Sequence, residues 1–180
     1  MKFIPTDIQD VIIIEPQVFG DERGAFWECY HQRKFHQAGI TTNFIQDNHS
    51  TSVQGTLRGL HFQTTPYAQS KLVRAISGEI FDVAVDLRSG SETYGHWVSC
   101  HLSSENKRML FIPQGFAHGF YVLSPEAQVH YKCDALYHPD ADRCVKWDDT
   151  NIAIDWPLLA PPIVSAKDQA GQALSAIQAQ

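Results

Sequence analysis

The sequence predicts an all-β fold, an antiparallel sandwich or barrel, and three observations favour it. Residues 80–87 alternate strictly, with apolar side chains at the odd positions and Asp82 and Asp86 on the opposite face, a period that is typical of a β-strand. Similar short runs recur every 8–12 residues between turn-forming residues, which indicates antiparallel strands. Helix signals are few, so we expect helices only as short additions at the periphery.

The expected elements follow one another without a linker or a repeat. Residues 31–39 have the pattern of a short helix that ends at its glycine, and the Ala- and Gln-rich tail after Asp168 predicts a second, weakly held helix. Turn formers stand at residues 77–78, 88–90, 103–106, 113–115 and 124–126. We therefore expect residues 1–180 to form a single domain, for which this length is sufficient. The expected strands, in chain order, are residues 10–15, 25–30, 43–48, 56–62, 71–77, 80–87, 96–102, 108–112, 118–123 and 128–133.

Composition and charge exclude several classes of function. The 14 Lys and Arg against 20 Asp and Glu give a formal charge of -6, and no basic cluster is longer than a pair, so we expect no nucleic-acid partner. The longest apolar runs are four residues, whereas a helix that spans a bilayer needs about 20, so we expect no membrane partner. The N-terminus has no apolar signal region, which favours a cytoplasmic protein.

Cysteine and histidine spacing argues against a metal site. The four cysteines form no C-x-x-C pair, and we expect them to be reduced and mostly buried. Small metal-binding β-barrels often place two histidines two residues apart on one strand, and none of the nine histidines forms such a pair. We therefore expect no metal. The sequence also lacks the G-x-G-x-x-G dinucleotide motif, the P-loop and the G-x-S-x-G elbow.

Lys71, His118 and Tyr131 are polar residues at strand positions that otherwise face a core. Lys71 shares its face with Val73 and Ala75. A lysine that points into a core is paired with another group, reaches solvent with its ammonium group while its methylene chain stays buried, or serves a function. Lys71 is thus either an edge lysine or a site residue. His118 and Tyr131 each stand alone among apolar neighbours on their strands.

Arg58 and His61 lie three positions apart on one expected strand. Strict alternation would place them on opposite faces, but Gly59 between them is compatible with a β-bulge that turns both toward one cavity. A single histidine in a strand is more often structural than catalytic. Both interpretations of His61 stay open at this point.

Nine stretches spread along the chain form one consistent set of motifs. They are residues 21–28 (DERGAFWE), 46–50 (QDNHS), 57–63 (LRGLHFQ), 71–74 (KLVR), 78–88 (GEIFDVAVDLR), 102–108 (LSSENKR), 112–120 (IPQGFAHGF), 131–132 (YK) and 165–168 (SAKD). In this order they resemble the nucleotide-sugar 3,5-epimerases, and in particular the dTDP-4-dehydrorhamnose 3,5-epimerase family. The resemblance extends from about residue 19 to residue 168, and nine motifs in register make it specific.

The resemblance implies a metal-free cupin jelly-roll barrel, a homodimer and a reaction without a cofactor. The implied substrate is a nucleotide sugar, dTDP-4-dehydro-6-deoxy-D-glucose, whose C3 and C5 are inverted to give dTDP-4-dehydro-L-rhamnose in dTDP-L-rhamnose biosynthesis. Both carbons lie next to the C4 ketone, so each loses a proton to form an enolate and regains one on the other face. This chemistry needs a base, an acid on the opposite face and a positive group at the enolate oxygen.

The resemblance also implies roles for individual residues. His61 corresponds to the general base, Asp168 to the carboxylate that orients its ring, and Tyr131 to the acid on the opposite face. Lys71 corresponds to the group that stabilises the enolate oxygen. Tyr137 corresponds to an aromatic residue that stacks on the thymine, within one subunit or across the dimer interface. The residues implied to bind the diphosphate, sugar and nucleoside are Arg23, Glu28, Gln46, Asp47, Asn48, Arg58, His118, Asp142 and Lys167.

Three departures from the usual pattern of the family leave the substrate preference open. Phe62 stands where Tyr is more common, Ser70 precedes Lys71 where Gly is usual, and Leu136 occupies a position that is often aromatic. Some relatives invert only one carbon while keeping most of these residues, so a mono-epimerase of another dTDP-4-keto-deoxysugar is the nearest alternative. A jelly roll that binds a nucleotide sugar without chemistry is a second alternative, and a metallocupin oxygenase is a third.

Overall fold

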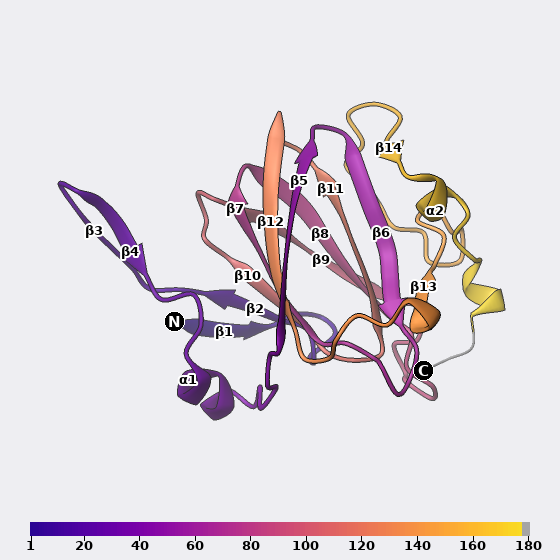
Figure 1. The fold of residues 1–180 in the computed structure, drawn as a ribbon, viewed down its shortest axis with the longest axis horizontal. Helices are drawn as coiled ribbons and strands as arrows, with labels where there is room; N and C mark the ends of the chain where they lie inside the picture. The colour runs from indigo at the N-terminus through magenta and orange to yellow at the C-terminus, as the bar shows by residue number, and fades with distance from the viewer. Residues whose placement is uncertain (178–180) are drawn as a thin grey trace.

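The computed structural model describes residues 1–177 and shows two sheets packed face to face (Figure 1). The first sheet has the strand order β1 (Lys2–Pro5), β2 (Ile12–Glu15), β10 (Met109–Ile112), β7 (Lys71–Ser77), β12 (Glu126–Cys133) and β5 (Gln46–Val53). The second has the order β13 (Asp142–Cys144), β6 (Thr56–Gln63), β11 (Phe116–Val122), β8 (Glu79–Asp86) and β9 (Trp97–Ser103), with β14 (Ile163–Val164) added beside β6. Every strand pair in the two sheets is antiparallel except that of β14 with β6. The result is a jelly-roll sandwich of the cupin type, which decides between the two architectures that the strand pattern left open.

Three apolar clusters hold the layers together. The first lies between the two sheets and includes Phe120. The second covers the outer face of the second sheet, where the C-terminal segment contributes Trp156. The third covers the outer face of the first sheet under α1 (Gln32–Gln37) and includes Phe35 and Met109. Each fully buried side chain of this size contributes about 1.5–3 kcal/mol, so both faces of both sheets add to stability.

Strand β8 shows what coverage of both sheet faces means for polar side chains. Because both faces of this strand are covered, Asp82 and Asp86 are fully buried rather than exposed. Burial favours the neutral form of Asp86, but hydrogen bonds from Arg88, Ser91 and Thr93 outweigh it and hold its pKa well below the ordinary value. Asp86 thereby fixes the turn that follows β8. Asp82 instead bonds to His118, inside the sandwich.

The strands β3 (Val18–Asp21) and β4 (Gly24–Trp27) form a two-stranded hairpin outside both large sheets. Figure 1 shows this hairpin extending away from the body of the molecule. It carries large apolar side chains in exposed positions, with Phe19 57% and Phe26 72% accessible. A protruding hairpin with an apolar surface is typical of a contact with another chain.

The helices agree with the sequence prediction near residue 35 and differ from it at the tail. The helix α2 (Ala166–Gln169) ends just after Asp168, and up to residue 177 only the 3-10 turn η2 (Leu174–Ala176) follows it, so the expected tail helix is wrong over these residues. Gly171 packs against the chain near Lys146, where a Cβ would lie 2.9 Å from the Lys146 Cα atom. Gly171 and Gln172 are thus held against the chain at residues 144–146. Part of the expected helix, residues 178–180, lies outside the described residues.

The cysteines agree with the expectation within the described residues. Cys100, Cys133 and Cys144 are buried free thiols, and Cys29 is a half-buried one. In residues 1–177, none of the helices has the length and apolar character needed to cross a membrane. One further short 3-10 turn, η1 (Pro139–Ala141), lies near the open end of the sandwich and leads into β13.

Candidate active site

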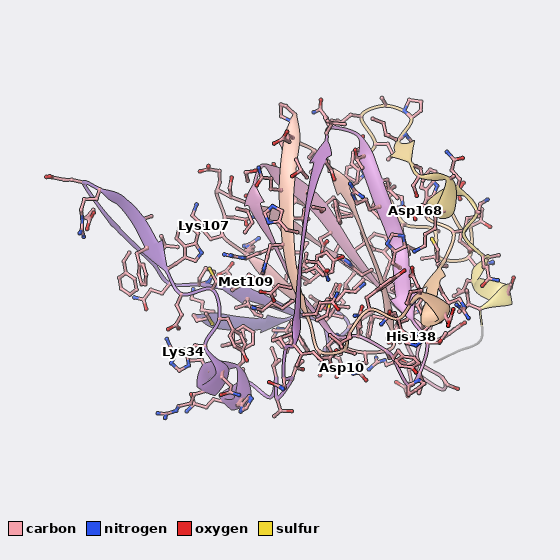
Figure 2. All side chains as sticks on the ribbon, viewed as in Figure 1. Asp10, Lys34, Lys107, Met109, His138 and Asp168 are labelled. Carbon is pink, nitrogen blue, oxygen red and sulfur yellow. The ribbon has the colours of Figure 1, made fainter. Side chains whose placement is uncertain are left out.

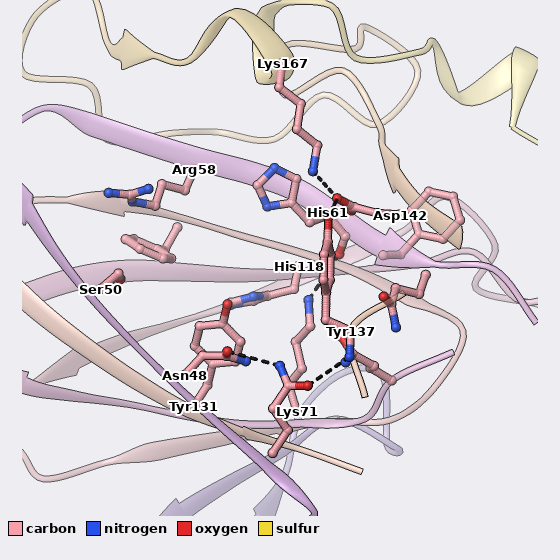
Figure 3. Close-up of a pocket in the computed structure, with 15 residues that line it drawn as sticks. Asn48, Ser50, Arg58, His61, Lys71, His118, Tyr131, Tyr137, Asp142 and Lys167 are labelled. Carbon is pink, nitrogen blue, oxygen red and sulfur yellow. Dashed lines mark hydrogen bonds and ion pairs between the residues drawn. The ribbon is translucent and has the colours of Figure 1, made fainter. Parts of the chain in front are cut away.

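A cavity of about 470 Å³ lies between the two sheets (Figure 3). Inward-facing side chains of both sheets line it, as expected for a ligand site in a jelly roll. The first sheet contributes Gln46, Asn48, Ser50, Lys71 and Tyr131; the second contributes Arg58, His61, Phe62, Gln63, His118, Phe120 and Asp142; and Gln69, Tyr137 and Lys167 come from neighbouring segments.

A β-bulge brings Arg58 and His61 to the same face of β6. His61 pairs with His118 and Arg58 pairs with Phe120, so two residues of β6 lie opposite Gly119 alone. The bulge predicted at Gly59 is therefore confirmed. Gly59 has φ +137°, and a Cβ there would lie 2.6 Å from the Gly119 Cα atom, so only a glycine fits this crossing.

His61 and Asp168 form a bonded pair at one wall of the cavity. The His61 Nε2 and Asp168 Oδ1 atoms are 2.6 Å apart, and Asp168 also accepts a hydrogen bond from the Gly59 backbone N–H. Ser165 caps α2 by accepting from the Asp168 backbone N–H at 3.1 Å, which fixes the start of the helix. Burial acts to raise the pKa of Asp168, but the bonds from His61 and Gly59 lower it overall, so the carboxylate stays charged. With Nε2 engaged, Nδ1 is the ring nitrogen left to accept a proton.

Lys71 lies at the floor of the cavity and is only 7% exposed. Its Nζ atom donates to the His61 backbone carbonyl at 3.3 Å, which joins the two sheets at this point. Burial lowers the pKa of Lys71, whereas Cys133, Asp82 and Asp142 act in the opposite direction. Of the two interpretations left open by the sequence, the structure supports a site residue, because the ammonium group faces the cavity rather than solvent.

Tyr131 lies across the cavity from His61, and His118 lies beside His61 on the neighbouring strand (Figure 3). Tyr131 belongs to the first sheet, and burial raises the pKa of its hydroxyl, which keeps the phenol protonated. His118 is buried, its Nε2 lies 2.7 Å from Asp82 Oδ1, and burial lowers the pKa of its ring. The rings of His118 and Tyr131 have centroids 6.3 Å apart.

The mouth of the cavity carries a second network. The Tyr137 hydroxyl donates to Asp142 Oδ2 at 3.0 Å, and Lys167 forms a short ion pair with the same carboxylate. The Tyr137 backbone N–H donates to Gln46 Oε1 at 2.8 Å, while Gln46 Nε2 donates to Asn48 Oδ1 at 3.1 Å. Arg58 is held by Ser52, so its guanidinium points along the cavity edge. These residues form a polar rim at the mouth of the cavity.

Three predicted binding residues lie away from the cavity in this chain. Arg23 is at the tip of the β3–β4 hairpin, with its side chain 89% exposed and paired only with Asp21. Glu28 pairs with Lys34 of α1, and Figure 2 shows Lys34 and Asp168 on opposite sides of the molecule. Asp47 lies on the outer face of β5 because strand alternation turns it away from its neighbours Gln46 and Asn48, and it pairs with Lys132.

Several lining residues were not predicted from the sequence. Ser50 follows from the alternation of β5, which places it on the face of Gln46 and Asn48. Gln63 and Gln69 reach the cavity because β6 and the loop after it end at its mouth. Phe120 follows from the alternation of β11, which places it on the face of His118. Phe62 borders the cavity although it packs in the outer cluster of the second sheet, and strand alternation does not predict such a position.

One group of possible metal ligands occurs within residues 1–177. His61, Cys144 and Asp168 have ligand atoms within 4.8 Å of one another. Two of these groups already bond to each other, and burial raises the pKa of the Cys144 thiol to about 12, which opposes the thiolate that a metal needs. The donor set therefore suits a hydrogen-bonded base better than a metal centre.

Comparison with known proteins gives the family. The family model of dTDP-4-dehydrorhamnose 3,5-epimerase matches residues 5–176. The dTDP-4-dehydrorhamnose 3,5-epimerase of Shigella flexneri is 54% identical to this chain, and the match covers 96% of this chain and 95% of that protein. The dTDP-4-dehydrorhamnose 3,5-epimerase of Pseudomonas aeruginosa is also 54% identical, and the match covers 97% of each chain. The dTDP-6-deoxy-D-glucose-3,5-epimerase of Legionella pneumophila, solved in complex with dTDP-4-keto-L-rhamnose, has a TM-score of 0.95 at 49% identity and covers 99% of this chain and 95% of its own. The chain therefore belongs to the dTDP-4-dehydrorhamnose 3,5-epimerase family, whose members are isomerases.

Proposed function

We propose that this cavity inverts C3 and C5 of dTDP-4-dehydro-6-deoxy-D-glucose to give dTDP-4-dehydro-L-rhamnose, without a cofactor, in the formation of dTDP-L-rhamnose. One observation carries the proposal: His61 and Tyr131 line the same cavity from opposite sheets. An inversion needs a base on one face of a carbon and an acid on the other. A sugar ring between the two sheets would present its two faces to these two residues.

His61 is the base in this proposal. Its Nδ1 atom takes the proton from the carbon next to the C4 ketone, and the electron pair of the C–H bond moves into the enolate. The Asp168 carboxylate, 2.6 Å from Nε2, holds the ring in one tautomer and stabilises the imidazolium that forms. Asp168 therefore compensates the positive charge that proton transfer places on the ring.

Lys71 stabilises the enolate oxygen. A buried ammonium group acts strongly on a nearby oxyanion because water does not screen it. His118 assists as a hydrogen-bond acceptor at the sugar through Nδ1, since burial lowers the pKa of its ring and its Nε2–H donates to Asp82. Removing a single oxyanion donor from such a site typically costs about 10²–10³ in kcat.

Tyr131 completes each inversion by delivering its hydroxyl proton to the carbon from the opposite face. One inversion moves one proton from the substrate to His61 and one from Tyr131 to the substrate, which leaves an imidazolium and a phenolate. His61 must then lose a proton to water and Tyr131 must regain one before the next inversion. This exchange with solvent predicts that hydrogen isotopes from water enter the product at both carbons.

The rim residues bind the nucleotide part. The guanidinium of Arg58 and the ammonium of Lys167 suit the diphosphate oxygens, and the exposed ring of Tyr137 suits stacking on thymine. Gln46 and Asn48 offer amide groups for the nucleoside, and Asp142 orients Tyr137 and Lys167.

The same proposal includes a cytoplasmic homodimer. Arg23 and Glu28 do not reach the cavity of their own chain, and the hairpin that carries Arg23 extends outward with exposed apolar residues. A second copy docked on this hairpin would bury Phe19 and Phe26 and bring Arg23 near the partner's cavity. The dimer thereby gives both the apolar surface and the displaced arginine a function.

Two variants separate the base from the acid. We expect His61→Ala to stop loss of deuterium from substrate labelled at C3. Tyr131→Phe should still release that deuterium, because His61 remains, but should form little inverted product, because protonation from the opposite face is lost. NMR of the sugar protons measures both. Full inversion by Tyr131→Phe, or deuterium loss at the wild-type rate by His61→Ala, would contradict these roles.

A further inference from the structure

Two loops meet at the mouth of the cavity, residues 64–70 after β6 and residues 134–141 after β12. The second loop carries Tyr137, whose side chain is largely exposed. The rings of Tyr67 and His138 stack across the two loops, with centroids 3.9 Å apart and an interplanar angle of 18°. The two loops therefore form one structural unit at the edge of the cavity.

Gln63, the last residue of β6, lies beneath this unit and is only 5% exposed. Its Nε2 atom donates to the Tyr67 carbonyl at 2.7 Å and to the Leu136 carbonyl at 3.3 Å. Its Oε1 atom accepts from the His138 backbone N–H at 2.6 Å. One amide thus binds the residues immediately before and after Tyr137 and, in addition, the opposite loop.

We propose that Gln63 is a positioning residue that holds the Tyr137 ring in place to bind the nucleoside. This inference rests on the proposed function, which places the thymine at Tyr137. Gln63 belongs to a strand fixed on both sides, by β11 and β13, so it provides a rigid point of attachment for an exposed ring. The other two contacts of Tyr137, to Gln46 and Asp142, come from side chains at the rim itself.

Only a carboxamide fits this role. The position needs two donated hydrogen bonds to carbonyl groups and one accepted bond from an N–H, and the two ends of the glutamine amide supply both kinds. Leucine at this position would leave buried backbone groups of both loops without partners. Glutamate would keep the acceptor for His138 but place an oxygen against two carbonyl oxygens.

The test is a double-mutant cycle on the binding of dTDP, measured by isothermal titration calorimetry with the full chain. We expect Gln63→Leu to weaken dTDP binding about 10-fold, the equivalent of about 1.4 kcal/mol. In the Tyr137→Ala background the same substitution should change the affinity less than about 2-fold, because the ring that Gln63 positions is gone. For turnover, KM should rise in Gln63→Leu while kcat stays within about 2-fold of wild type.

Two further variants make the outcome specific. Gln54→Leu is the matched control, because the Gln54 amide also bonds a backbone carbonyl, that of Leu123, but lies outside the cavity lining, and it should bind dTDP as wild type does. Gln63→Glu, which keeps the size of the side chain, replaces Gln63→Leu in the cycle if the leucine variant does not fold by circular dichroism.

Each result has one meaning. Equal losses of affinity in the wild-type and Tyr137→Ala backgrounds would overturn the inference, since Gln63 would then act independently of Tyr137. Unchanged dTDP binding in a folded Gln63 variant would overturn it too, and so would a fall in kcat without a rise in KM. If the wild-type chain itself failed to bind dTDP, the proposed function would be wrong. This outcome is distinguishable from those that overturn only the role of Gln63.

Discussion

At the scale of the residue, the chemistry depends on which nitrogen of His61 faces the substrate. Asp168 binds Nε2 and accepts one further bond from the Gly59 backbone N–H, so its position is fixed independently of the ligand. The arrangement resembles the acid–base pair of a hydrolase without a nucleophile. It leaves the base oriented before the substrate arrives, and such preorganisation is a main source of catalytic rate.

We predict that Asp168→Asn lowers kcat about 10²- to 10⁴-fold. The amide is close in size to the carboxylate but cannot stabilise the imidazolium, and it favours the wrong tautomer when its NH₂ group faces Nε2. Binding of dTDP should stay within a few-fold of wild type, because Asp168 does not line the cavity. Steady-state kinetics and calorimetry measure the two quantities. A variant with wild-type turnover would show that the pair is structural only.

The pH dependence of turnover should identify Lys71. In the proposed mechanism this residue works as an ammonium ion, and burial lowers its pKa, so we expect kcat to fall on the alkaline side below the ordinary lysine value of 10.5. Tyr131 must also be protonated, but burial raises its pKa, so it loses its proton later than Lys71 does. Cys133 also lies near Lys71, and burial raises the pKa of its thiol to about 11, so the thiol loses its proton later than Lys71 does.

The matched variant is Lys71→Arg, which keeps the positive charge at all accessible pH values. It should have a lower kcat than wild type and should lose the alkaline fall or shift it to higher pH. An alkaline limb identical to that of wild type would mean that another group controls it.

Most of the candidate site could be predicted because strand alternation and the family motifs agree. His61, Lys71, His118 and Tyr131 stand at inward positions and occur within the matched stretches. Asp47 shows the limit of such reasoning, since it belongs to a matched stretch but alternation turns it outward. Gln63 shows the opposite limit, because its function depends on two loops whose meeting no local pattern reveals.

At the scale of the element, the bulge of β6 decides the shape of the cavity. It exists because Gly59 has a positive φ and approaches Gly119 closely, and it turns Arg58 and His61 to one side. The strand order then places these two residues opposite the first sheet. The active site is therefore as sensitive to this backbone crossing as to any catalytic side chain.

We predict that Gly59→Ala destabilises the protein and reduces activity. The positive φ alone costs roughly 1–3 kcal/mol, and the collision with the Gly119 backbone adds to it. Gly90→Ala is the control, since Gly90 also has a positive φ, +73°, but a Cβ there meets no atom within 4 Å. Chemical denaturation should show a larger loss of unfolding free energy for Gly59→Ala. Equal losses would mean that the crossing tolerates a side chain.

The predicted strands correspond to ten elements of the structure, with ends displaced by a few residues. The strands that were not predicted are short: β1, β3, β13 and β14 have two to four residues each, too few for a period to be visible. β14 forms because the C-terminal segment returns to pair with the start of β6, a contact between distant parts of the chain. The tail helix was overpredicted because Ala and Gln favour helices locally, while packing of Gly171 and Leu174 against the body overrides that preference.

At the scale of the whole molecule, we propose one domain per chain and two chains per active assembly. Among residues 1–177, the hairpin β3–β4 pairs with no strand of the two large sheets, and it exposes Phe19 and Phe26. Its Arg23 is the one predicted diphosphate-binding arginine that lies outside the cavity. Sedimentation should therefore give twice the chain mass of 20.3 kDa.

Mixed dimers test whether Arg23 acts in the partner's site. Arg23→Ala and His61→Ala chains should each have low activity alone. Mixed and allowed to exchange subunits, they should regain activity, because in the mixed dimer the cavity with an intact His61 receives Arg23 from the other chain. About a quarter of the wild-type activity is expected at equal mixing, since half of the dimers are mixed and each has one complete site. No recovery after verified exchange would place Arg23 in its own subunit or outside the site.

The most direct test of the central claim is to incubate the protein with dTDP-4-dehydro-6-deoxy-D-glucose in D₂O and to follow C3 and C5 by NMR and mass spectrometry. We predict deuterium at both carbons of dTDP-4-dehydro-L-rhamnose, since His61 removes each proton and Tyr131 returns one exchanged with solvent. Deuterium at only one carbon would contradict the double inversion. Inversion without any deuterium from solvent would contradict the roles of His61 and Tyr131.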